Sequence, residues 1–194
     1  MDKEEILQEY RDAGALLEGH FKLSSGLHSP MYLQCARVLM DPVRAERLCR
    51  VVADKIKAAG HEIDLVVSPA MGGVVVGYEM ARQLGVPGVF TERVEGEFAL
   101  RRGFDIPKGA KILMMEDIIT TGLSSRECIS VIREWGGDVV AAGCLIDRSN
   151  GSAEVGAPVY ALLAMEIPVY ESTNLPDTLK NIPAIKPGSR GIKS

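Results

Sequence analysis

The segment that most limits how this chain can fold runs from Lys111 to Ser125. It opens with a short apolar run, Lys111–Met115, which has the length and composition of a β-strand buried on both faces. Two adjacent carboxylates, Glu116 and Asp117, stand where this strand is expected to end. Small hydroxyl and glycine residues follow, and apolar residues then recur at helical spacing from 126 to 135. The segment therefore predicts a buried strand, a small-residue loop and a helix in direct succession.

A loop between a strand and a helix N-terminus is suited to binding an anion. Its backbone N–H groups lack partners, Gly122 allows a phosphate to come close, and the helix dipole favours negative charge. Carboxylates beside such a loop can accept hydrogen bonds from the vicinal hydroxyls of a sugar. Together these features predict a site for a phosphorylated ribose. The alternative is an acidic strand end followed by an ordinary helix, with Ser124 or Ser125 as its N-cap.

A second glycine-rich turn, Ser68–Gly73, has the same setting. It follows a predicted buried strand, Ile63–Val67, and it opens a predicted helix that continues to Gln83. The turn is therefore a second candidate anion site. The alternative is a tight turn whose glycines only allow close packing of strand and helix.

The order of elements predicts the fold class. Helical segments alternate with short apolar strands near residues 63, 88, 111, 138 and 159, which indicates an α/β fold with a central, mostly parallel sheet flanked by helices. Such sheets bind ligands at the carboxyl ends of their strands, where both candidate anion turns lie. The remaining expected elements are helices at 4–18 and 42–60, a strand–turn–strand at 20–34, a hairpin at 88–102, a last strand at 159–165, and a short helix with extended chain after it.

The composition limits the kinds of partner and compartment. A chain of 194 residues with 46% hydrophobic and 25% charged residues suits one globular domain spanning 1–194. A formal net charge of -4 favours neither nucleic acid nor a membrane as the main partner. The charged start of the chain and the lack of a long apolar run predict no signal peptide and no membrane span. The cysteines lie apart in apolar segments and are predicted to be buried free thiols, as in a cytoplasmic protein: Cys35, Cys49, Cys128 and Cys144.

Two stretches carry a resemblance to a known family. Residues Met115–Ser124 resemble the phosphoribosyl pyrophosphate signature of type I phosphoribosyltransferases. Residues His20–Gln34, with the Ser-Gly and Ser-Pro pairs and the aromatic Tyr32, resemble the N-terminal hood of orotate phosphoribosyltransferases. The pair Asp147 and Arg148 resembles the strand end at which that family recognises the orotate carboxylate. From the residues alone, a surface ion pair between Asp147 and Arg148 is the alternative.

The resemblance implies an enzyme that transfers ribose 5-phosphate from phosphoribosyl pyrophosphate to orotate, with Mg²⁺ as cofactor and with these two small molecules as its ligands. Magnesium would be held mostly by substrate oxygens and water. It also implies three parts within the one domain, namely a hood (residues 1–40), a flap (91–108) and a tail (171–194), the last without assigned chemistry. A homodimer is implied too, in which the flap can serve the neighbouring subunit.

The same resemblance implies roles for individual residues. Asp117 and Arg93 are the expected catalytic residues. The expected residues for phosphoribosyl pyrophosphate are Glu116, Asp117, Ile118, Ile119, Thr120, Thr121, Gly122, Leu123, Ser124, Met71 and Gly72. The expected orotate-binding residues are Thr120, Arg148, Tyr32 and Leu33. From the sequence alone, the arginines of the flap, Arg93, Arg101 and Arg102, could equally form a solvated basic edge.

Departures from the family pattern keep two other functions open. Ser24 stands where relatives carry a hood lysine, with Lys22 or His28 as the candidate substitutes, and Met71 stands in the turn that usually holds an aromatic–lysine pair. The flap also lacks a lysine-rich run. One alternative is a purine phosphoribosyltransferase, which needs neither the hood nor Arg148. The other is a regulator that senses phosphoribosyl pyrophosphate without catalysis, although the chain shows no basic surface for nucleic acid.

Overall fold

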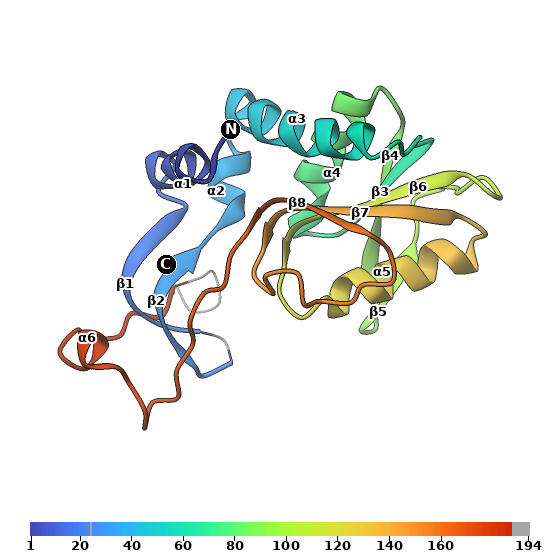
Figure 1. Cartoon of the computed structure of the whole chain (residues 1–194). Coiled ribbons are helices and arrows are strands. Elements are labelled where there is room, and N and C mark those ends of the chain that lie inside the picture. The colour runs from blue at the N-terminus through green and yellow to red at the C-terminus, as the bar shows by residue number, and fades with distance from the viewer. Residues whose placement is uncertain (24, 188–194) are drawn as a thin grey trace.

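The computed structural model describes residues 1–23 and 25–187 (Figure 1). The helices are α1 (Lys3–Asp12), α2 (Cys35–Leu39), α3 (Pro42–Ala58), α4 (Gly72–Leu84), α5 (Leu123–Glu134) and α6 (Asp177–Lys180). The strands are β1 (Leu16–Lys22), β2 (His28–Leu33), β3 (Leu65–Pro69), β4 (Gly88–Val94), β5 (Glu97–Leu100), β6 (Lys111–Ile119), β7 (Asp138–Asp147) and β8 (Val159–Ala164). Two parts of the sequence predictions lie outside the described residues: Ser24, which stands where relatives carry a hood lysine, and the end of the predicted tail, 188–194.

A six-stranded sheet in the order β5-β4-β3-β6-β7-β8 forms the centre of the molecule. Every neighbouring pair in it is parallel except the hairpin β4–β5, so the predicted α/β fold with a mostly parallel sheet is confirmed. A separate antiparallel pair, β1–β2, forms the predicted strand–turn–strand of the hood. In Figure 1 this pair lies beside the main sheet, together with the chain that follows β8.

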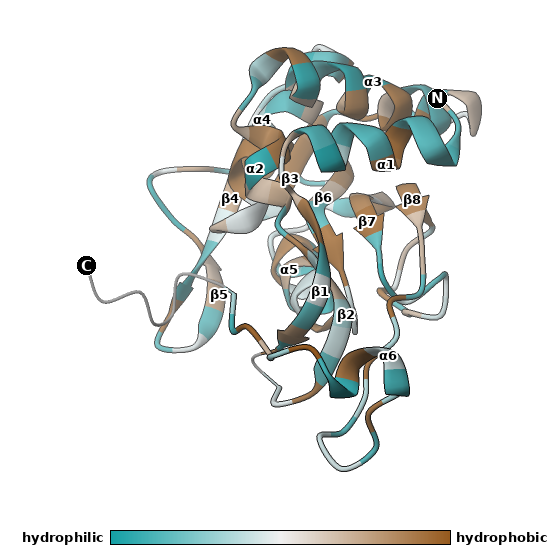
Figure 2. Cartoon of the chain, turned by 90° about the vertical axis from the view of Figure 1, so that its left-hand side faces the viewer, coloured by the Kyte–Doolittle hydropathy of each residue, from teal (hydrophilic) through white to brown (hydrophobic). Residues whose placement is uncertain are grey.

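The strand β6 packs against helices on both faces. Its residues Leu113 and Met115 belong to a hydrophobic cluster that includes the buried faces of α3 and α4, whereas Ile112 and Met114 belong to a second cluster with α5. This division follows from the alternation of side chains along a strand. Figure 2 shows the hydrophobic colour concentrated on the strands and on the helix faces turned towards them. The sheet is thus buried on both faces, which explains why its strands are continuous apolar runs.

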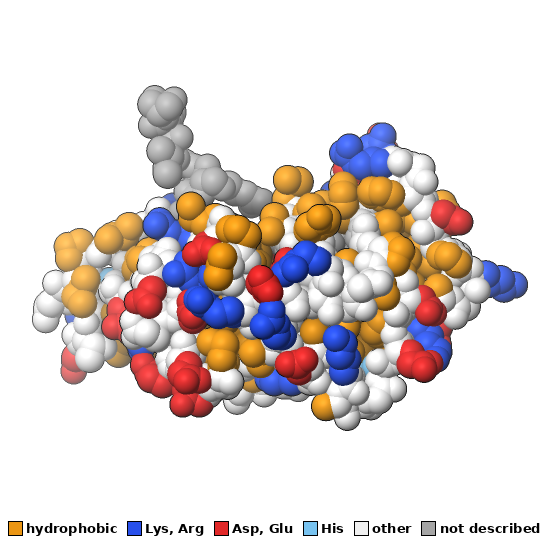
Figure 3. All heavy atoms as spheres, turned by 90° about the horizontal axis from the view of Figure 1, so that it is seen from above, with side chains coloured by type: hydrophobic (Ala, Val, Ile, Leu, Met, Phe, Trp, Pro, Cys, Tyr) orange, Lys and Arg blue, Asp and Glu red, His pale blue; other side chains and the backbone are white. Residues whose placement is uncertain are grey.

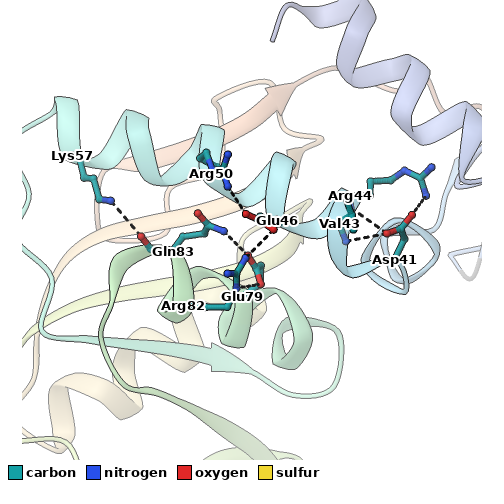
Figure 4. Close-up of polar contacts among 9 residues, drawn as sticks. All are labelled: Asp41, Val43, Arg44, Glu46, Arg50, Lys57, Glu79, Arg82 and Gln83. Atoms are coloured by element: carbon teal, nitrogen blue, oxygen red, sulfur yellow. Dashed lines mark hydrogen bonds and ion pairs between the residues drawn. The ribbon is translucent and has the colours of Figure 1, made fainter.

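A layer of ion pairs and hydrogen bonds joins α3 to α4 (Figure 4). Arg82 lies between Glu79, at 2.8 Å, and Glu46, at 3.4 Å. Burial raises the pKa of Glu79, but hydrogen bonds from Arg82 and Gln83 outweigh it and hold that pKa below its ordinary value. At the start of α3, Asp41 accepts a hydrogen bond from the N–H of Val43 at 2.9 Å and caps the helix. The contact of Arg82 with Glu46 thus ties α4 to α3, and the first residues of α4 belong to the second glycine-rich turn.

The predicted helix over 4–18 is wrong in its second half. The helix α1 ends at Asp12, and the following residues enter β1. Gly14 has a φ of +59°, its N–H donates to the carbonyl of Arg11, and the N–H of Ala15 donates to the carbonyl of Tyr10. These are the two hydrogen bonds of a Schellman motif, which stops a helix at a left-handed residue. The helix predicted to end at residue 18 would have stopped before Gly19, the next glycine along the chain, instead of at Gly14.

The prediction for the central segment is wrong about the end of the strand. The strand β6 does not end at Met115 but continues to Ile119, because β7 offers parallel partners as far as Asp147. The alternative of an ordinary helix capped by Ser124 or Ser125 is wrong too, because the N-cap of α5 is Gly122, with a φ of +74°. The carboxylates therefore lie within the strand, and the loop between strand and helix is shorter than expected.

Other predictions are confirmed. The helix expected at 42–60 is α3, the hairpin at 88–102 is β4–β5, and the last strand is β8. The four cysteines are buried free thiols. Among the described residues, no helix is both long enough and apolar enough to cross a membrane.

Candidate active site

The two carboxylates at the end of β6 point to opposite faces of the sheet. Glu116 follows Met114 in the alternation and faces α5, where it accepts a hydrogen bond from the hydroxyl of the buried Ser125. Asp117 faces the other side, towards the start of α4. A Cβ added to Gly72 would lie 2.9 Å from Oδ1 of Asp117, so only glycine fits there without displacing the carboxylate. The strand thus presents one acid to each of the two glycine-rich turns.

Burial changes the acidity of both groups. Burial, together with the smaller effect of the neighbouring Asp117, raises the pKa of Glu116 to about 7 against the opposing hydrogen bond from Ser125. Burial also raises the pKa of Asp117, although backbone N–H groups lower it. Desolvated carboxylates of this kind bind hydrogen-bond donors strongly when these replace the missing water.

The loop after β6 forms a small pocket of about 210 Å³, lined by Glu116, Ile118, Thr120, Thr121, Gly122, Leu123 and Ser124. Gly122 as N-cap offers no side-chain oxygen to the first turn of α5, which leaves N–H groups there for a ligand. A guanidinium N–H of Arg126 donates to the carbonyl oxygens of Thr121, at 3.0 Å, and Glu154, at 2.8 Å. Arg126 thus fixes the loop from outside.

The second turn connects β3 to α4. The peptide bond between Ala70 and Met71 is cis, and the N–H of Ala70 donates to the carbonyl of Thr91 at 2.7 Å. The Met71 side chain is 85% exposed, and Gly72 lies against Asp117 as described above. The structure therefore brings Gly72, and with it the neighbouring Met71, to the carboxylate of Asp117.

Arg148 follows β7 and is partly buried. Its Nε is buried without a hydrogen-bond partner in the part of the chain that the structure describes, and burial lowers the pKa of its guanidinium. The alternative of a surface ion pair with Asp147 is wrong. The buried Asp147 carboxylate instead accepts hydrogen bonds from the N–H groups of Ser149 and Gly151, both at 2.8 Å. Arg148 thus carries a buried hydrogen-bond donor that no described residue satisfies.

The end of the hood reaches the same place. The thiol of Cys35, directly after β2, donates to the carbonyl oxygen of Asp117 at 3.7 Å and contacts the hydroxyl of Tyr10 at 3.8 Å. Tyr32 donates its hydroxyl to Gln34 at 3.0 Å, and Leu33 pairs with Leu16 of β1. Only Gln34 separates Leu33 from Cys35, which contacts β6. The predicted hood residues Tyr32 and Leu33 therefore lie close to the strand that carries the two carboxylates.

The flap arginines are all paired with acids. Arg93 donates to Glu127 of α5, and its guanidinium lies 4.1 Å from the centre of the Phe98 ring. Arg101 and Arg102 both pair with Glu92, at 3.6 and 2.9 Å. None of the three lines the pocket of the loop. The structure thus brings the two turns and Arg148 to the same edge of the sheet, whereas Arg93 is paired with Glu127 of α5.

Sequence reasoning missed three residues that shape this site. Ser125 was expected in the phosphate loop or as a helix cap, yet its buried hydroxyl donates to Glu116. Arg126 could have been suspected, because a guanidinium one turn into a helix can reach back to the preceding loop. Cys35 carried no signal, since its contact with Asp117 joins residues far apart in the chain.

Comparison with known proteins identifies relatives along the whole chain. The sequence model of the family described as the phosphoribosyl transferase domain matches residues 41–176. The chain is 56% identical over 193 residues to an orotate phosphoribosyltransferase of Phenylobacterium zucineum, with 100% of each chain covered. It is 54% identical over 193 residues to the orotate phosphoribosyltransferase of Caulobacter vibrioides, again with 100% of both chains covered.

Solved structures share the fold. An orotate phosphoribosyltransferase from Aeropyrum pernix superposes with a TM-score of 0.67 at 26% identity, covering 82% of this chain and 93% of that one. The adenine phosphoribosyltransferase of Saccharomyces cerevisiae gives a TM-score of 0.66 at 21% identity, covering 82% of this chain and 99% of that one. Fold alone therefore does not separate a pyrimidine from a purine substrate, whereas the full-length sequence relatives carry the pyrimidine name.

Proposed function

This chain belongs to the orotate phosphoribosyltransferases of the phosphoribosyl transferase domain family, and on that premise we propose that it transfers ribose 5-phosphate to orotate in the synthesis of pyrimidine nucleotides. The donor is phosphoribosyl pyrophosphate, and the products are orotidine monophosphate and pyrophosphate. The observation that carries this function is the full-length identity of 56% to a relative of that name. The geometry of the sheet edge supports it.

The donor fits between the two turns. We assign its 5-phosphate to the N–H groups of Thr120–Ser124, in the pocket of about 210 Å³ at the start of α5. Its ribose hydroxyls donate to Glu116 and Asp117, and Ile118 and Ile119 hold these acids in the strand. Met71 and Gly72 then face the pyrophosphate. This assignment uses the fact that Gly72 and Asp117 are in contact.

The base fits between Arg148 and the hood. A guanidinium whose buried Nε lacks a partner matches the carboxylate of orotate, which a purine base does not carry. Tyr32 and Leu33 offer backbone groups to the other edge of the ring, and Thr120 lies at the side of the loop. In this proposal the chain is one phosphoribosyltransferase domain, and two parts of it, the hood (1–40) and the flap (91–108), close over the site.

The reaction breaks the bond between the ribose C1 and a pyrophosphate oxygen and forms a bond from C1 to a ring nitrogen of orotate. Positive charge develops on the ribose ring as pyrophosphate leaves, and the nearby Asp117 carboxylate stabilises it. Arg93, released from Glu127 when the flap closes, binds the pyrophosphate and helps to exclude water.

The acids at the end of β6 also suit the cofactor that the family implies. Carboxylate oxygens are the ligands that Mg²⁺ prefers, and this ion usually keeps water and substrate oxygens rather than a full protein cage. Glu116 and Asp117 would contact it directly or through water. When bound, Mg²⁺ neutralises charge on the pyrophosphate leaving group.

We further propose that the protein is a homodimer in which the flap serves the neighbouring site. Val75 and Tyr78 lie on one face of α4 and are 52% and 73% exposed. The view from above in Figure 3 also shows many hydrophobic side chains at the surface beside charged ones. Sedimentation equilibrium should give a dimer for the wild type and a monomer for Tyr78→Glu, whereas a monomeric wild type would contradict this proposal.

The activity is tested by the loss of orotate absorbance in the presence of phosphoribosyl pyrophosphate and Mg²⁺, with adenine, hypoxanthine and uracil in parallel. Of the four bases, we expect only orotate to be turned over, and we expect no turnover after chelation of the metal. Turnover of a purine would indicate the sister enzyme. Binding of phosphoribosyl pyrophosphate without turnover of any base would indicate a sensor.

A further inference from the structure

The chain that follows β8 has no part in the reaction described above, yet it makes specific contacts with the hood. We call residues 165–187 the C-terminal segment. It begins in the core, where Met165 and Ile167 are buried in the same hydrophobic cluster as α3 and α4. The N–H of Met165 also donates to the carbonyl of Asp147 at 2.9 Å, next to Arg148. The segment is therefore anchored at the strand end that we assign to the base.

From there the segment reaches both edges of the hood hairpin. On the β2 edge, Tyr170 and His28 exchange two backbone hydrogen bonds, both of 2.8 Å. On the β1 edge, the N–H of Ile185 donates to the carbonyl of His20, and the N–H of Lys22 donates to the carbonyl of Ile185, both at 2.8 Å. A two-stranded hairpin alone is marginally stable in water, so pairing on both edges supplies the order that it lacks.

Two buried histidines lie at this junction. His20 and His28 are 4% and 7% exposed, and Nε2 of His20 lies 2.6 Å from Nδ1 of His28. Nδ1 of His20 lies 2.6 Å from the carbonyl oxygen of Ile182. A carbonyl only accepts, so Nδ1 of His20 carries a proton. With both rings neutral, His28 must then donate from its Nδ1 to Nε2 of His20, which leaves Nε2 of His28 as a bare acceptor.

The pattern of partners agrees with this assignment. Nε2 of His28 is buried and has no hydrogen-bond partner among the described residues. If both rings carried a charge, two N–H groups would face each other across 2.6 Å, so the observed contact excludes the doubly protonated pair. The pair therefore joins β1, β2 and the C-terminal segment only while at least one ring is neutral.

We propose that the C-terminal segment is a clamp that sets the position of the hood over the base, and that His20 is the positioning residue that fastens it. This inference rests on the proposed function, because the hood supplies Tyr32 and Leu33 to orotate. A loosened clamp lowers the fraction of molecules whose hood is in place, and the apparent affinity for orotate falls by that fraction. Binding of phosphoribosyl pyrophosphate to the loops of the sheet is independent of it.

The clamp also depends on pH. The titratable and charged groups that act on His28 are His20 and Lys22. Burial, then His20, then Lys22 lower the pKa of His28 below the ordinary histidine value of 6.5. His28 therefore takes up a proton at a higher pH when the hood is open than when it is closed. As the pH falls below about 6.5, protonation of His28 favours the open hood and weakens the clamp. Above that pH His28 is neutral in both states, and the clamp does not change with pH.

The proline variant Ile185→Pro tests the clamp, because it removes the N–H that donates to His20. The matched control Ile185→Ala keeps that N–H at the same position, where the side chain is 61% exposed. We expect the KM for orotate to rise about fivefold in the proline variant alone, with the affinity for phosphoribosyl pyrophosphate unchanged. Amide exchange protection of Lys22 and His28 should fall in the same variant. Equal protection and equal KM values in the two variants would overturn the proposal.

A second pair of variants covers the case in which the proline variant does not fold. Asparagine can place an amide donor near the position of Nδ1, so His20→Asn should keep the bond to Ile182, and His20→Ala should lose it. At pH 7.5 we expect hood protection factors, corrected for intrinsic exchange, to be lower in His20→Ala than in His20→Asn. Between pH 7.5 and 5.5 we expect them to fall in the wild type and to fall less in His28→Gln, which removes the ring that takes up the proton. A pH-independent wild type would overturn the role of the pair. Exchange does not depend on turnover, so this result stands apart from any failure of the proposed activity.

Discussion

The raised pKa of Glu116 makes a prediction about stability that is independent of any substrate. The carboxyl is largely buried against Ser125, and its pKa is about 7, compared with an ordinary value of 4.5. At about 1.4 kcal/mol per pH unit, ionising Glu116 in the folded protein costs about 3 kcal/mol more than in the unfolded chain. The unfolded state loses its proton first as pH rises. Glu116 therefore reduces the free energy of unfolding progressively between pH 4.5 and about 7.

The isosteric variant Glu116→Gln removes this effect and keeps a hydrogen-bond acceptor for Ser125. Between pH 5.5 and 8.0 we expect the free energy of unfolding of the variant to rise by about 2 kcal/mol relative to that of the wild type. Urea unfolding at both pH values measures this difference directly. The matched control Glu166→Gln alters an exposed carboxyl and should leave the pH dependence unchanged. If the difference in free energy of unfolding between Glu116→Gln and the wild type changed by less than about 0.5 kcal/mol between the two pH values, the described burial of Glu116 would be incorrect.

Other predictions concern the reaction. Arg148→Gln should lower kcat/KM for orotate about tenfold to a hundredfold, because a charge-assisted hydrogen bond is lost, with phosphoribosyl pyrophosphate binding unchanged in calorimetry. Arg93→Ala should reduce kcat about a hundredfold or more, and near-normal turnover would remove Arg93 from the mechanism. Gly72→Ala would place a Cβ 2.9 Å from Oδ1 of Asp117, so kcat/KM for phosphoribosyl pyrophosphate should fall about a hundredfold in initial-rate assays. A variant as active as the wild type would show that this contact does not position the acid.

Local signals in the sequence were sufficient for the core of the fold. The apolar run from Lys111 and the helical spacing after Ser125 predicted β6 and α5, and Pro42 and Gly60 marked the two ends of α3. These elements are predictable because burial on a regular strand or helix leaves a period in the sequence. The spacing of apolar residues does not show where a strand ends when the neighbouring strand of the sheet extends further and continues to pair with it. The extension of β6 to Ile119 is a consequence of pairing with β7.

Contacts between distant residues were beyond sequence reasoning. The contact of Cys35 with Asp117 and the pairing of Ile185 with β1 each depend on the complete fold. Gly14 was visible in the sequence, but the apolar residues after it continued the helical spacing and concealed the Schellman motif. Arg148 was found through resemblance, and its buried, unpartnered Nε gives a physical reason for the role proposed for it.

The assignment of this sheet edge to orotate is tested most directly by following orotate loss and pyrophosphate release together, in the wild type and in Arg148→Gln. In the wild type we expect equal rates of both, each dependent on phosphoribosyl pyrophosphate and Mg²⁺. In the variant we expect loss of both while phosphoribosyl pyrophosphate still binds. Pyrophosphate release without loss of orotate, or a variant that consumes orotate at the wild-type rate, would contradict the assignment of this sheet edge to orotate.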